Sequence, residues 1–404
     1  MQMQDEIRSF DIVIIGASLA GSLTALLLSK NKNLKILILD KKIPNTENID
    51  FTDQNKYQPR VVALNLASKE ILENIGVWNL LPASRLGGMR KISVSESHGP
   101  QKIEFDGFAS GHDNLAYVVE NDLLLNKLQE KLNQHHNIKI EEVEINKINN
   151  FKEKAEIILD NQRKIKTKLI IAADGANSFV RNYFDLKTFI KDYENTALVA
   201  NIYTDISHEN VARQKFLKSG PIALLPLGDS NSISIVWSTN KESAEKLLSI
   251  NEEEFCRELN QRFNFKIGNN IKLTSKRFTF PLFERHLDSY FCDRVVLLGD
   301  AAHTIHPLAG QGLNLGILDA KILADEIIKA HNIQTDFGAF EVLKRYQSRR
   351  RGHNQILIYA MRFFKDFYCS ESLPVSIIRN LGVGIFNNTN FIKDRIIKFA
   401  IGQN

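Results

Sequence analysis

Short apolar runs rich in β-branched and leucine residues give the strongest pattern along the chain. They lie at residues 12–15 (IVII), 34–39 (LKILIL), 169–172 (LIIA) and 295–298 (VVLL), and glycine or aspartate stands close behind each one. Near-continuous apolar runs of this length are typical of strands buried on both faces, as in a parallel sheet covered by helices. The sequence therefore predicts a parallel sheet with helices on its faces.

Apolar residues at helical spacing lie between and after these runs. An alanine and leucine helix follows Gly21, and helices are expected at 121–132, 313–330 and 337–367. The segment RVVALNLASKEILENIGVW, which begins at Arg60, is also expected to enter a helix, whose apolar face carries Leu66, Ile71, Leu72 and Ile75.

Residues 182–280 follow a different pattern. Their apolar segments TALVANIY, GPIALLPLGD, SISIVWS and IKLTSKRFTF are separated by short polar turns, with helical pieces around 241–263. Consecutive strands with short turns predict an antiparallel sheet. Strand-like pieces at 91–95 and 102–105 are expected to join it.

The composition is that of a folded protein with more than one core. The chain has 404 residues, of which 43% are hydrophobic and 25% charged, so two connected domains are expected. Its three cysteines lie far apart, which fits a reducing cytosol rather than a disulfide framework or a zinc site. The polar start MQMQDEIRSF contains no secretory signal, and no run reaches the length of a membrane span. We expect a cytoplasmic protein.

Positive charge is concentrated near the end of the chain. From Glu341 onward there are eleven Lys or Arg residues against four acids, a net charge of +7, while the whole chain carries +5 and the remainder therefore −2. The segment SLPVSIIRNLGVGIFNNTNFIKDRIIKFAIG offers two short amphipathic helices. They either pack on the body of the protein or contact an anionic membrane surface, such as the inner membrane face, or a partner protein. We expect no nucleic-acid partner.

A glycine turn joins the first predicted strand to its helix in DIVIIGASLAGSLTALLLSK. Gly16 suits the tight turn, Gly21 suits close packing of helix and strand, and Asp40 ends the next strand, where its carboxylate suits ribose hydroxyls. This is the dinucleotide-binding fingerprint, although Ser18 replaces its second glycine. The motif does not separate FAD from NAD, but its place near the start of the chain, with no second copy, favours FAD.

Two further corners place an aspartate beside a glycine at a strand end. Asp300 follows Gly299, and Asp174 precedes Gly175. The carboxyl ends of strands in open α/β sheets are where ligands bind, so a ribityl or ribose hydroxyl suits both carboxylates. For either pair alone, an ordinary turn is the alternative interpretation.

The segment beyond Asp300 predicts a site for negative charge. Pro307 is followed by Gly310, Gln311 and Gly312, and a helix pattern starts at once. Glycines at the start of a helix allow backbone N–H groups to approach a ligand, and the positive helix end stabilises an anion there.

Three motifs in this order resemble those of the flavoprotein aromatic hydroxylases. They are GASLAG, ADGANSFVR and GDAAHTIHPLAGQGLNLG, and the last is similar to the ubiquinone-biosynthesis branch of that family, as are VEN, ALLPLGDSNSISIVWS and FPL. The resemblance implies an FAD-dependent monooxygenase that uses dioxygen to form a flavin hydroperoxide and hydroxylates the aromatic ring of a polyprenylated phenol. The external reductant implied is NADPH, NADH or a ferredoxin.

The resemblance and the motifs together give a set of candidate cofactor-binding residues. For Arg60, a surface salt bridge is an equal alternative, and for Asn121 a helix cap is the alternative. Arg181 is expected to hold the loop after Asp174. The set is Gly16, Ser18, Leu19, Ala20, Gly21, Asp40, Lys41, Arg60, Asn121, Asp174, Gly299, Asp300, Pro307, Gly310, Gln311, Gly312, Leu313 and Asn314.

An apolar pocket between the segment after Asp300 and the antiparallel sheet is expected to bind the phenol and to exclude water. Its predicted lining is Leu225, Pro226, Val236 and Trp237, together with Pro307. His303 and His306 have HxxH spacing, but no third ligand accompanies them, so structural hydrogen bonding is favoured over a metal site. No catalytic side chain is assigned, because the flavin carries the chemistry.

The expected fold class is α/β, with a Rossmann-like FAD-binding domain, an inserted antiparallel-sheet substrate domain and a helical C-terminal region. The FAD-binding domain is assigned residues 1–90, 111–181 and 286–335, and the substrate domain residues 91–110 and 182–285. The basic helical region takes residues 336–404. Three other functions share these features: hydroxylation of a small soluble phenol, reduction of prenyl double bonds, and a non-catalytic flavoprotein of a biosynthetic assembly.

Overall fold

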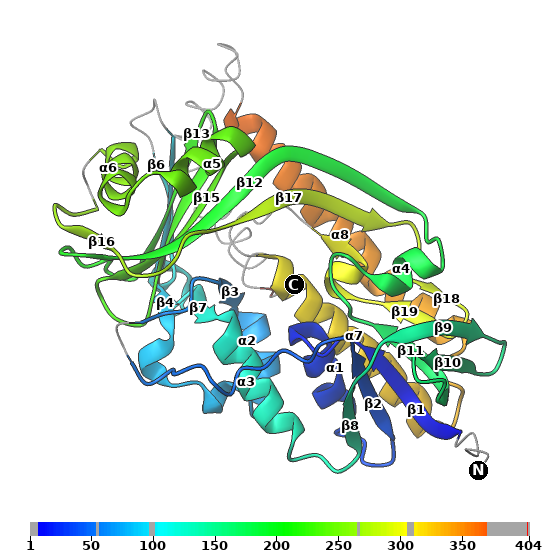
Figure 1. The fold of residues 1–404 in the computed structure, drawn as a ribbon. Coiled ribbons are helices and arrows are strands. Elements are labelled where there is room, and N and C mark those ends of the chain that lie inside the picture. Colours follow the sequence, from blue (N-terminus) through cyan, green and yellow to red (C-terminus); the bar gives the residue numbers. More distant parts are fainter. Residues whose placement is uncertain are drawn as a thin grey trace.

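The computed structural model describes residues 7–53, 56–96, 102–264, 267–304, 311–369 and 402. The chain forms an eight-stranded sheet, a nine-stranded sheet and a small sheet of three strands. Figure 1 shows the nine-stranded sheet beside a layered body built from the eight-stranded sheet and its helices. The α/β class and the two kinds of sheet were both expected.

The eight-stranded sheet has a parallel centre. Its main order is β18-β19-β11-β1-β2-β8, and β10 and β9 extend it through antiparallel pairing with β11. Pairing is parallel from β19 through β11, β1 and β2 to β8. The strands are β1 (Arg8–Ile15), β2 (Ile36–Asp40), β8 (Ile138–Glu142), β9 (Ile145–Asn150), β10 (Ala155–Leu159), β11 (Lys164–Ala172), β18 (Phe291–Cys292) and β19 (Val295–Leu297).

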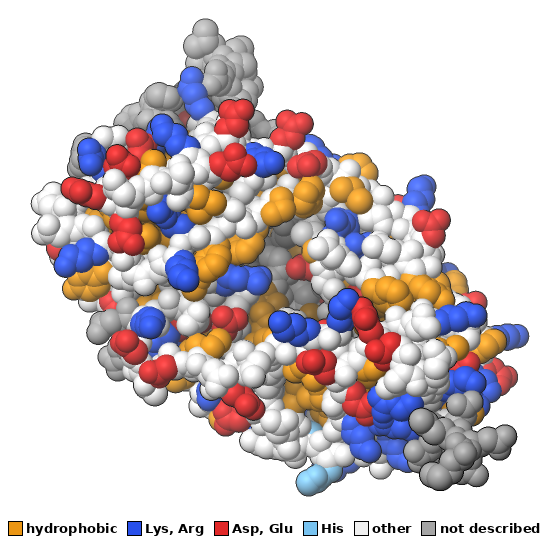
Figure 2. Space-filling model, viewed as in Figure 1, with side chains coloured by type: hydrophobic (Ala, Val, Ile, Leu, Met, Phe, Trp, Pro, Cys, Tyr) orange, Lys and Arg blue, Asp and Glu red, His pale blue; other side chains and the backbone are white. Residues whose placement is uncertain are grey.

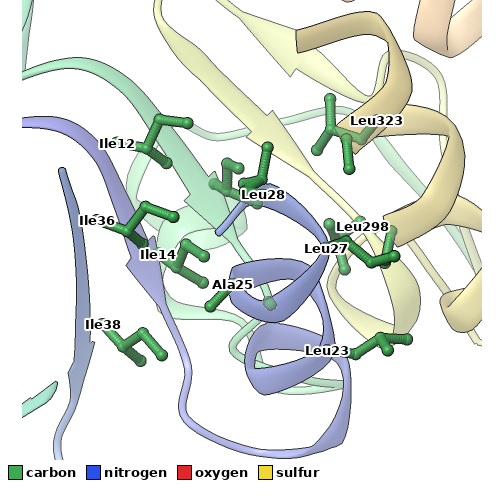
Figure 3. Close-up of a cluster of buried hydrophobic side chains, with 14 of the residues drawn as sticks. Ile12, Ile14, Leu23, Ala25, Leu27, Leu28, Ile36, Ile38, Leu298 and Leu323 are labelled. Carbon is green, nitrogen blue, oxygen red and sulfur yellow. The ribbon is translucent and has the colours of Figure 1, made fainter. Parts of the chain in front are cut away.

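Helices cover this sheet and bury its apolar runs. Helix α1 (Leu19–Leu28) packs against α3 (Asn121–Leu132) and α7 (Gln311–Asn332). Side chains of α1 meet Ile12, Ile14, Ile36 and Leu323 in one cluster (Figure 3), and all four of these residues are fully buried. The continuous apolar runs thus form the core of the protein, as sequence periodicity predicted.

The nine-stranded sheet has the order β20-β17-β12-β15-β14-β13-β5-β6, with β16 paired to β12. Its pairs are antiparallel except for β13 with β5. Helices α5 (Lys241–Ser249) and α6 (Glu252–Arg262) bury apolar residues against it. The strands are β5 (Lys91–Glu96), β6 (Lys102–Asp106), β12 (Thr188–Thr204), β13 (Val211–Leu217), β14 (Gly220–Pro226), β15 (Ser232–Asn240), β16 (Ile271–Leu273), β17 (Phe278–Leu287) and β20 (His303–Thr304).

The three-stranded sheet corrects one prediction. It has the order β3-β7-β4, formed by β3 (Val61–Asn65), β4 (Gly87–Met89) and β7 (Ala116–Glu120). The segment after Arg60 therefore runs first as a strand, and helix α2 (Leu66–Asn74) begins only where the Asn65 side chain accepts a hydrogen bond from the backbone N–H of Ser68. The VVAL run is β-branched and pairs with β7, which outweighs its helical spacing.

Two long helices follow the last corner of the sheet. Helix α7 (Gln311–Asn332) matches the helix expected at 313–330, and α8 (Phe340–Cys369) that expected at 337–367. The remaining elements are α4 (Phe179–Tyr183) and the 3-10 helices η1 (Trp78–Leu80), η2 (Ala83–Arg85), η3 (Phe108–Ser110) and η4 (Gly299–Ala301). In the described ranges, no helix is both long and apolar enough to span a membrane. The two amphipathic helices predicted after residue 371 fall outside those ranges.

Close packing at the turn before α1 gives a testable expectation. A Cβ atom at Gly21 would lie 1.9 Å from the carbonyl oxygen of Gly16, so Gly21→Ala forces backbone apart and is expected to cost about 3 kcal/mol of unfolding free energy. At Gly352, inside α8, a Cβ atom meets nothing within 4 Å, so Gly352→Ala should stabilise by about 1 kcal/mol. Urea unfolding measures both changes. Equal midpoints for the two variants would contradict this packing.

Candidate functional site

Three strand ends meet at one edge of the parallel sheet. Ile15 of β1 pairs with Ala172 of β11, which in turn pairs with Leu297 of β19. The chain therefore leaves all three strands side by side, and the glycine and aspartate corners predicted from sequence are neighbours in space.

Gly16 and Gly21 allow the closest of these approaches. Gly16 has a φ of +113°, and a Cβ atom there would lie 2.3 Å from the carbonyl oxygen of Ala173. A side chain at Gly21 would collide with Gly16 itself. Both glycines are therefore required for α1 to start against the β11 corner, as the fingerprint predicted.

The first corner is open at the start of α1. Ser18 is exposed and stands at the N-cap of the helix without a side-chain cap hydrogen bond, and Leu19 and Ala20 are half-buried behind it. Asp40 lies beside this turn, because its Oδ2 accepts a hydrogen bond from the backbone N–H of Ala17 at 2.7 Å. Lys41 points away from the turn and pairs with Glu144 on the surface.

The second corner is held by buried polar contacts. Asp174 Oδ2 accepts from the backbone N–H of Val180 at 3.1 Å, while its Oδ1 is buried with no hydrogen-bond partner in the described chain. Burial raises the pKa of the Asp174 carboxyl. Arg181 donates to the carbonyls of Ala176 and Ala301. It ties the second corner to the third through carbonyl groups, not through an acid.

The third corner presents Asp300 to the cleft. Solvent reaches its side chain, but protein surrounds it on most sides, and this loss of hydration raises the pKa of the carboxyl, against the effect of His303, Arg60 and Arg285. Three cationic side chains from separate segments thus act on one aspartate. Pro307 and Gly310 lie outside the described residues.

The start of α7 separates two roles that the motif had combined. At Gly312 a Cβ atom would meet nothing within 4 Å, so this position opens to free space, and Leu313 packs partly on the core. Asn314 is buried: its Oδ1 accepts from the backbone N–H of Asn65 and from Ser68 Oγ, and its Nδ2 donates to the Ala63 carbonyl. The Asn314 side chain therefore joins α7 to β3 and α2, so its predicted role toward the cofactor has no support from its contacts. Gln311 opens the helix.

Arg60 lies at the rim of the cleft and does not form the predicted alternative, a surface salt bridge. Its guanidinium is exposed and stands over the ring of Phe280, with 5.3 Å between the Cζ atom and the ring centroid. The Arg60 carbonyl accepts from the backbone N–H of Asn121. Asn121 is the first residue of α3, and Glu120 is the cap, so the helix-cap interpretation of Asn121 is wrong. Asn121 Oδ1 is buried without a partner in the described chain.

A buried ion pair fixes the segment that carries Arg60. Arg85 and Glu120 are each 1% exposed and joined at 2.6 Å. Arg85 also donates to the carbonyls of Asp53 and Lys56, and Glu120 accepts from the backbone N–H of Gln58. Because a buried charge is stable only with such partners, the pair holds the loop before Arg60 in one place.

A cleft of about 870 Å³ opens beside Arg60, between the loop before β3 and strand β17. Figure 2 shows this face of the molecule hollowed between its two parts, with Lys and Arg side chains near the rim. The lining is Lys56, Tyr57, Gln58, Pro59, Arg60, Asp122, Leu248, Glu252, Leu273, Thr274, Ser275, Lys276, Arg277, Phe278 and Phe280.

None of the predicted lining residues Leu225, Pro226, Val236 and Trp237 borders this cleft. Trp237 packs against Phe255 of α6, with 6.3 Å between ring centroids, on the helix-covered face of the nine-stranded sheet. Leu225 and Val236 pack on the opposite face, toward the three-stranded sheet, and Pro226 is buried there against Gly87. Strand alternation separates residues that are adjacent in sequence, so the assignment of Trp237 to the pocket is corrected.

The histidine pair is resolved in part. His303 is 1% exposed, and its Nε2 lies 2.5 Å from Asp319 Oδ2, which confirms structural hydrogen bonding for this residue. His306 lies outside the described residues. Within the described ranges no group of three His, Cys, Asp or Glu side chains is arranged to hold a metal.

Comparison with known proteins identifies the nucleotide. A family described as FAD binding domain matches residues 9–359. The chain belongs to this FAD-binding family. Ubiquinone biosynthesis monooxygenase COQ6, mitochondrial, of Xenopus tropicalis is 31% identical and covers 97% of this chain and 93% of its own length. The Drosophila melanogaster protein of the same name is 32% identical over 98% and 90%, and that of Homo sapiens 30% over 97% and 92%.

Solved structures of related folds agree. Pseudomonas aeruginosa PqsL in complex with 2-aminobenzoylacetate has a TM-score of 0.77 at 21% identity, covering 93% of this chain and 99% of its own. Pseudomonas putida p-nitrophenol 4-monooxygenase PnpA has 0.78 at 18%, over 98% and 99%. Klebsiella pneumoniae HpxO complexed with FAD has 0.72 at 12%, over 98% and 99%. These likenesses show the fold.

As a member of the FAD-binding family, the protein is a flavin-dependent monooxygenase with FAD as its cofactor. The residues at the three corners fit that group. Asp174 Oδ1 and Asn121 Oδ1 are buried acceptors without partners in the described chain, and native proteins rarely leave such groups unsatisfied. Ligand hydroxyl and amide groups would supply the missing hydrogen bonds.

Sequence reasoning missed two sets of residues around the third corner. Arg285 of β17 donates to the Ala176 carbonyl and reaches the electrostatic environment of Asp300. Asp319 and Arg350 lie within helices and form a fully buried ion pair. A lone arginine in a strand and an acid in a helix are common on surfaces, so no local pattern indicated either set.

The buried histidine beside this corner predicts a pH dependence of stability. Burial, then the nearby charge of His303, lower the pKa of His286 to about 4, whereas an unfolded chain has about 6.5. Between these values the unfolded state binds the extra proton, so stability should fall as pH drops from about 6.5 to about 4. His286→Gln should flatten this slope, measured by urea midpoints at several pH values. The exposed His136→Gln is the control, and an unchanged slope in His286→Gln would contradict the assignment.

Proposed function

We propose that this protein hydroxylates the aromatic ring of a polyprenylated phenol in ubiquinone biosynthesis, with FAD and dioxygen. The supporting observation is the near-full-length similarity, at 30 to 32% identity, to the COQ6 monooxygenases from three animals. That similarity extends through both sheets, so it covers the cofactor edge and the region above it. Fold similarity alone would support only an FAD-binding protein.

The proposal gives the corner residues distinct roles. The exposed N-terminus of α1 at Ser18 would receive the pyrophosphate, and Asp40 would accept a ribose hydroxyl. Asp300 would accept a ribityl hydroxyl, while Arg60 would favour negative charge at the cleft. Bound FAD supplies the activation of dioxygen and the transfer of one oxygen atom to the ring.

The nine-stranded sheet would exclude water from the reacting atoms. Phe278 and Phe280 of β17 contribute aromatic surface to the cleft, and Arg60 stacks over the second of them. Water exclusion matters because the reactive oxygen is lost as hydrogen peroxide when solvent reaches it. We propose that the prenyl chain completes this exclusion when the phenol binds.

The reductant, the partners and the place of action are also part of the proposal. NADPH, NADH or a ferredoxin delivers the electrons, and anaerobic reduction of the purified holoenzyme by each donor distinguishes them. A prenylated phenol resides in a membrane, so we propose that the protein works as a peripheral protein at a membrane surface. The basic region predicted to make this contact lies outside the described residues.

One observation favours a second candidate, hydroxylation of a small soluble phenol. The cleft lining contains four cationic residues against the two acids Asp122 and Glu252. These cations are Lys56, Arg60, Lys276 and Arg277. Such a lining suits a substrate carboxylate. Arg277 is already engaged, however, because it donates to the Leu247 and Ile250 carbonyls.

Substrate assays and one variant test the proposal. The holoenzyme is expected to couple reductant oxidation to hydroxylation of a prenylated hydroxybenzoate or phenol, and to release mainly hydrogen peroxide with the unprenylated compound. Asp300→Asn should weaken FAD binding about ten-fold through loss of a charge-assisted hydrogen bond. Asp325→Asn, in an exposed ion pair of α7, is the matched control.

The readouts are product mass, peroxide yield and FAD titration by fluorescence. Efficient coupling with the small phenol alone would replace the proposal by the second candidate. Quinone-precursor profiling in a deletion strain then names the ring position, because the accumulated compound is the substrate of the missing step.

A further inference from the structure

A buried carboxylate in α7 gathers four donors from three directions. Asp319 Oδ2 accepts from the backbone N–H of Gly299 at 3.1 Å and lies 2.5 Å from His303 Nε2. Its Oδ1 accepts from Arg350 Nε at 2.6 Å and from Asn354 Nδ2 at 3.4 Å. One side chain thus joins the third corner of the cofactor edge to helix α8.

This carboxylate is ionised in the protein core. Asp319 is 0% exposed and Arg350 2%. Burial alone would raise the pKa of the Asp319 carboxyl, but the charges and hydrogen bonds of His303 and Arg350 outweigh it and hold the pKa well below its usual value. Apolar residues of similar volume often stabilise a core at least as well as a buried ion pair. Stability alone therefore does not account for the pair.

A second buried carboxylate receives α8 further along. Glu284 of β17 is 1% exposed and pairs with Arg362 through both guanidinium branches. Tyr193 of β12 donates to the same carboxylate at 2.5 Å. Arg350 and Arg362 are twelve residues apart, about 18 Å along a helix. Helix α8 is therefore anchored to α7 at one point and to the nine-stranded sheet at the other.

Strand β17 connects the two anchors to the cleft. Glu284 is turned to α8, the next residue Arg285 reaches the Ala176 carbonyl at the second corner, and His286 Nε2 lies 3.1 Å from the Tyr290 hydroxyl. That hydroxyl accepts from Asn354, which also bonds to Asp319. Figure 1 shows α8 running alongside both parts of the molecule.

Asp300 depends on this framework for its position. Within the described residues its carboxylate has no hydrogen-bond partner, and the nearest fixed point is the Gly299 N–H held by Asp319. We propose that Asp319–Arg350 and Glu284–Arg362 are positioning pairs through which α8 sets Asp300 and Arg285 relative to each other for FAD. The proposal depends on FAD binding and not on which phenol is hydroxylated.

Arg350→Lys tests the first pair. Lysine keeps the charge but loses the planar fork that engages Asp319 and Asn354 together. We expect FAD affinity, titrated by flavin fluorescence, to fall about ten-fold, and the flavin reduction potential to shift. Arg349→Lys is the matched control, because its neighbouring partner Glu326 meets it at the half-exposed helix surface.

Arg362→Lys tests the second pair at the sheet. Because it does not touch the Gly299 corner, we expect FAD affinity within about two-fold of wild type, as a loss well below 1.4 kcal/mol gives. The peroxide released per reductant oxidised should rise, since Arg285 loses its fixed strand. Far-UV circular dichroism and melting curves of all holo variants verify folding.

The outcomes separate positioning from general stabilisation. Lower melting temperatures with wild-type FAD affinity, potential and coupling below melting would reduce both pairs to structural roles and overturn the proposal. If Arg350→Lys fails to fold, Arg362→Lys decides alone through its coupling ratio: wild-type coupling overturns the proposal, and increased peroxide supports it. A shifted potential without prenyl-phenol hydroxylation would keep this inference and remove the proposed function.

Discussion

The close contact of backbone at adjacent strand ends is the constraint on which this structure depends. Gly16 lies so near Ala173 that even a methyl group would collide with its carbonyl oxygen, and Gly21 lies equally close to Gly16. These contacts place the start of α1 beside the ends of β11 and β19. Once the three ends are side by side, chain segments remote in sequence are obliged to share one edge, and the ligand can touch all of them.

Much of the fold follows from apolar patterning. The four continuous runs became buried parallel strands because helices cover both faces, a situation with only one sequence solution. Prediction failed at β3, where the VVAL segment satisfies both helical and strand spacing. The strand forms because β7, more than fifty residues later, offers a pairing edge. Local sequence holds no record of such a distant partner.

The candidate site was predictable where backbone geometry defines it and not where side chains converge from afar. Gly16, Asp174 and Asp300 were recognised because turns and strand ends leave a local pattern. Trp237 was misplaced, since alternation shows that neighbours face opposite sides but not which side a helix will cover. Asp319 and Arg350 carry no local signature, because their meaning lies entirely in each other.

The short ladder between β17 and β20 makes the two parts of the molecule inseparable. Strand β20 belongs to the nine-stranded sheet, yet it follows directly on the Gly299 corner of the parallel sheet. During synthesis, β1 must wait for β11 and β19, and the outer sheet cannot close its edge until the same late segment emerges. Neither half is then a self-sufficient folding unit, so refolding should be slow and cooperative, and a chain cut before residue 304 leaves both sheets with an open, aggregation-prone border.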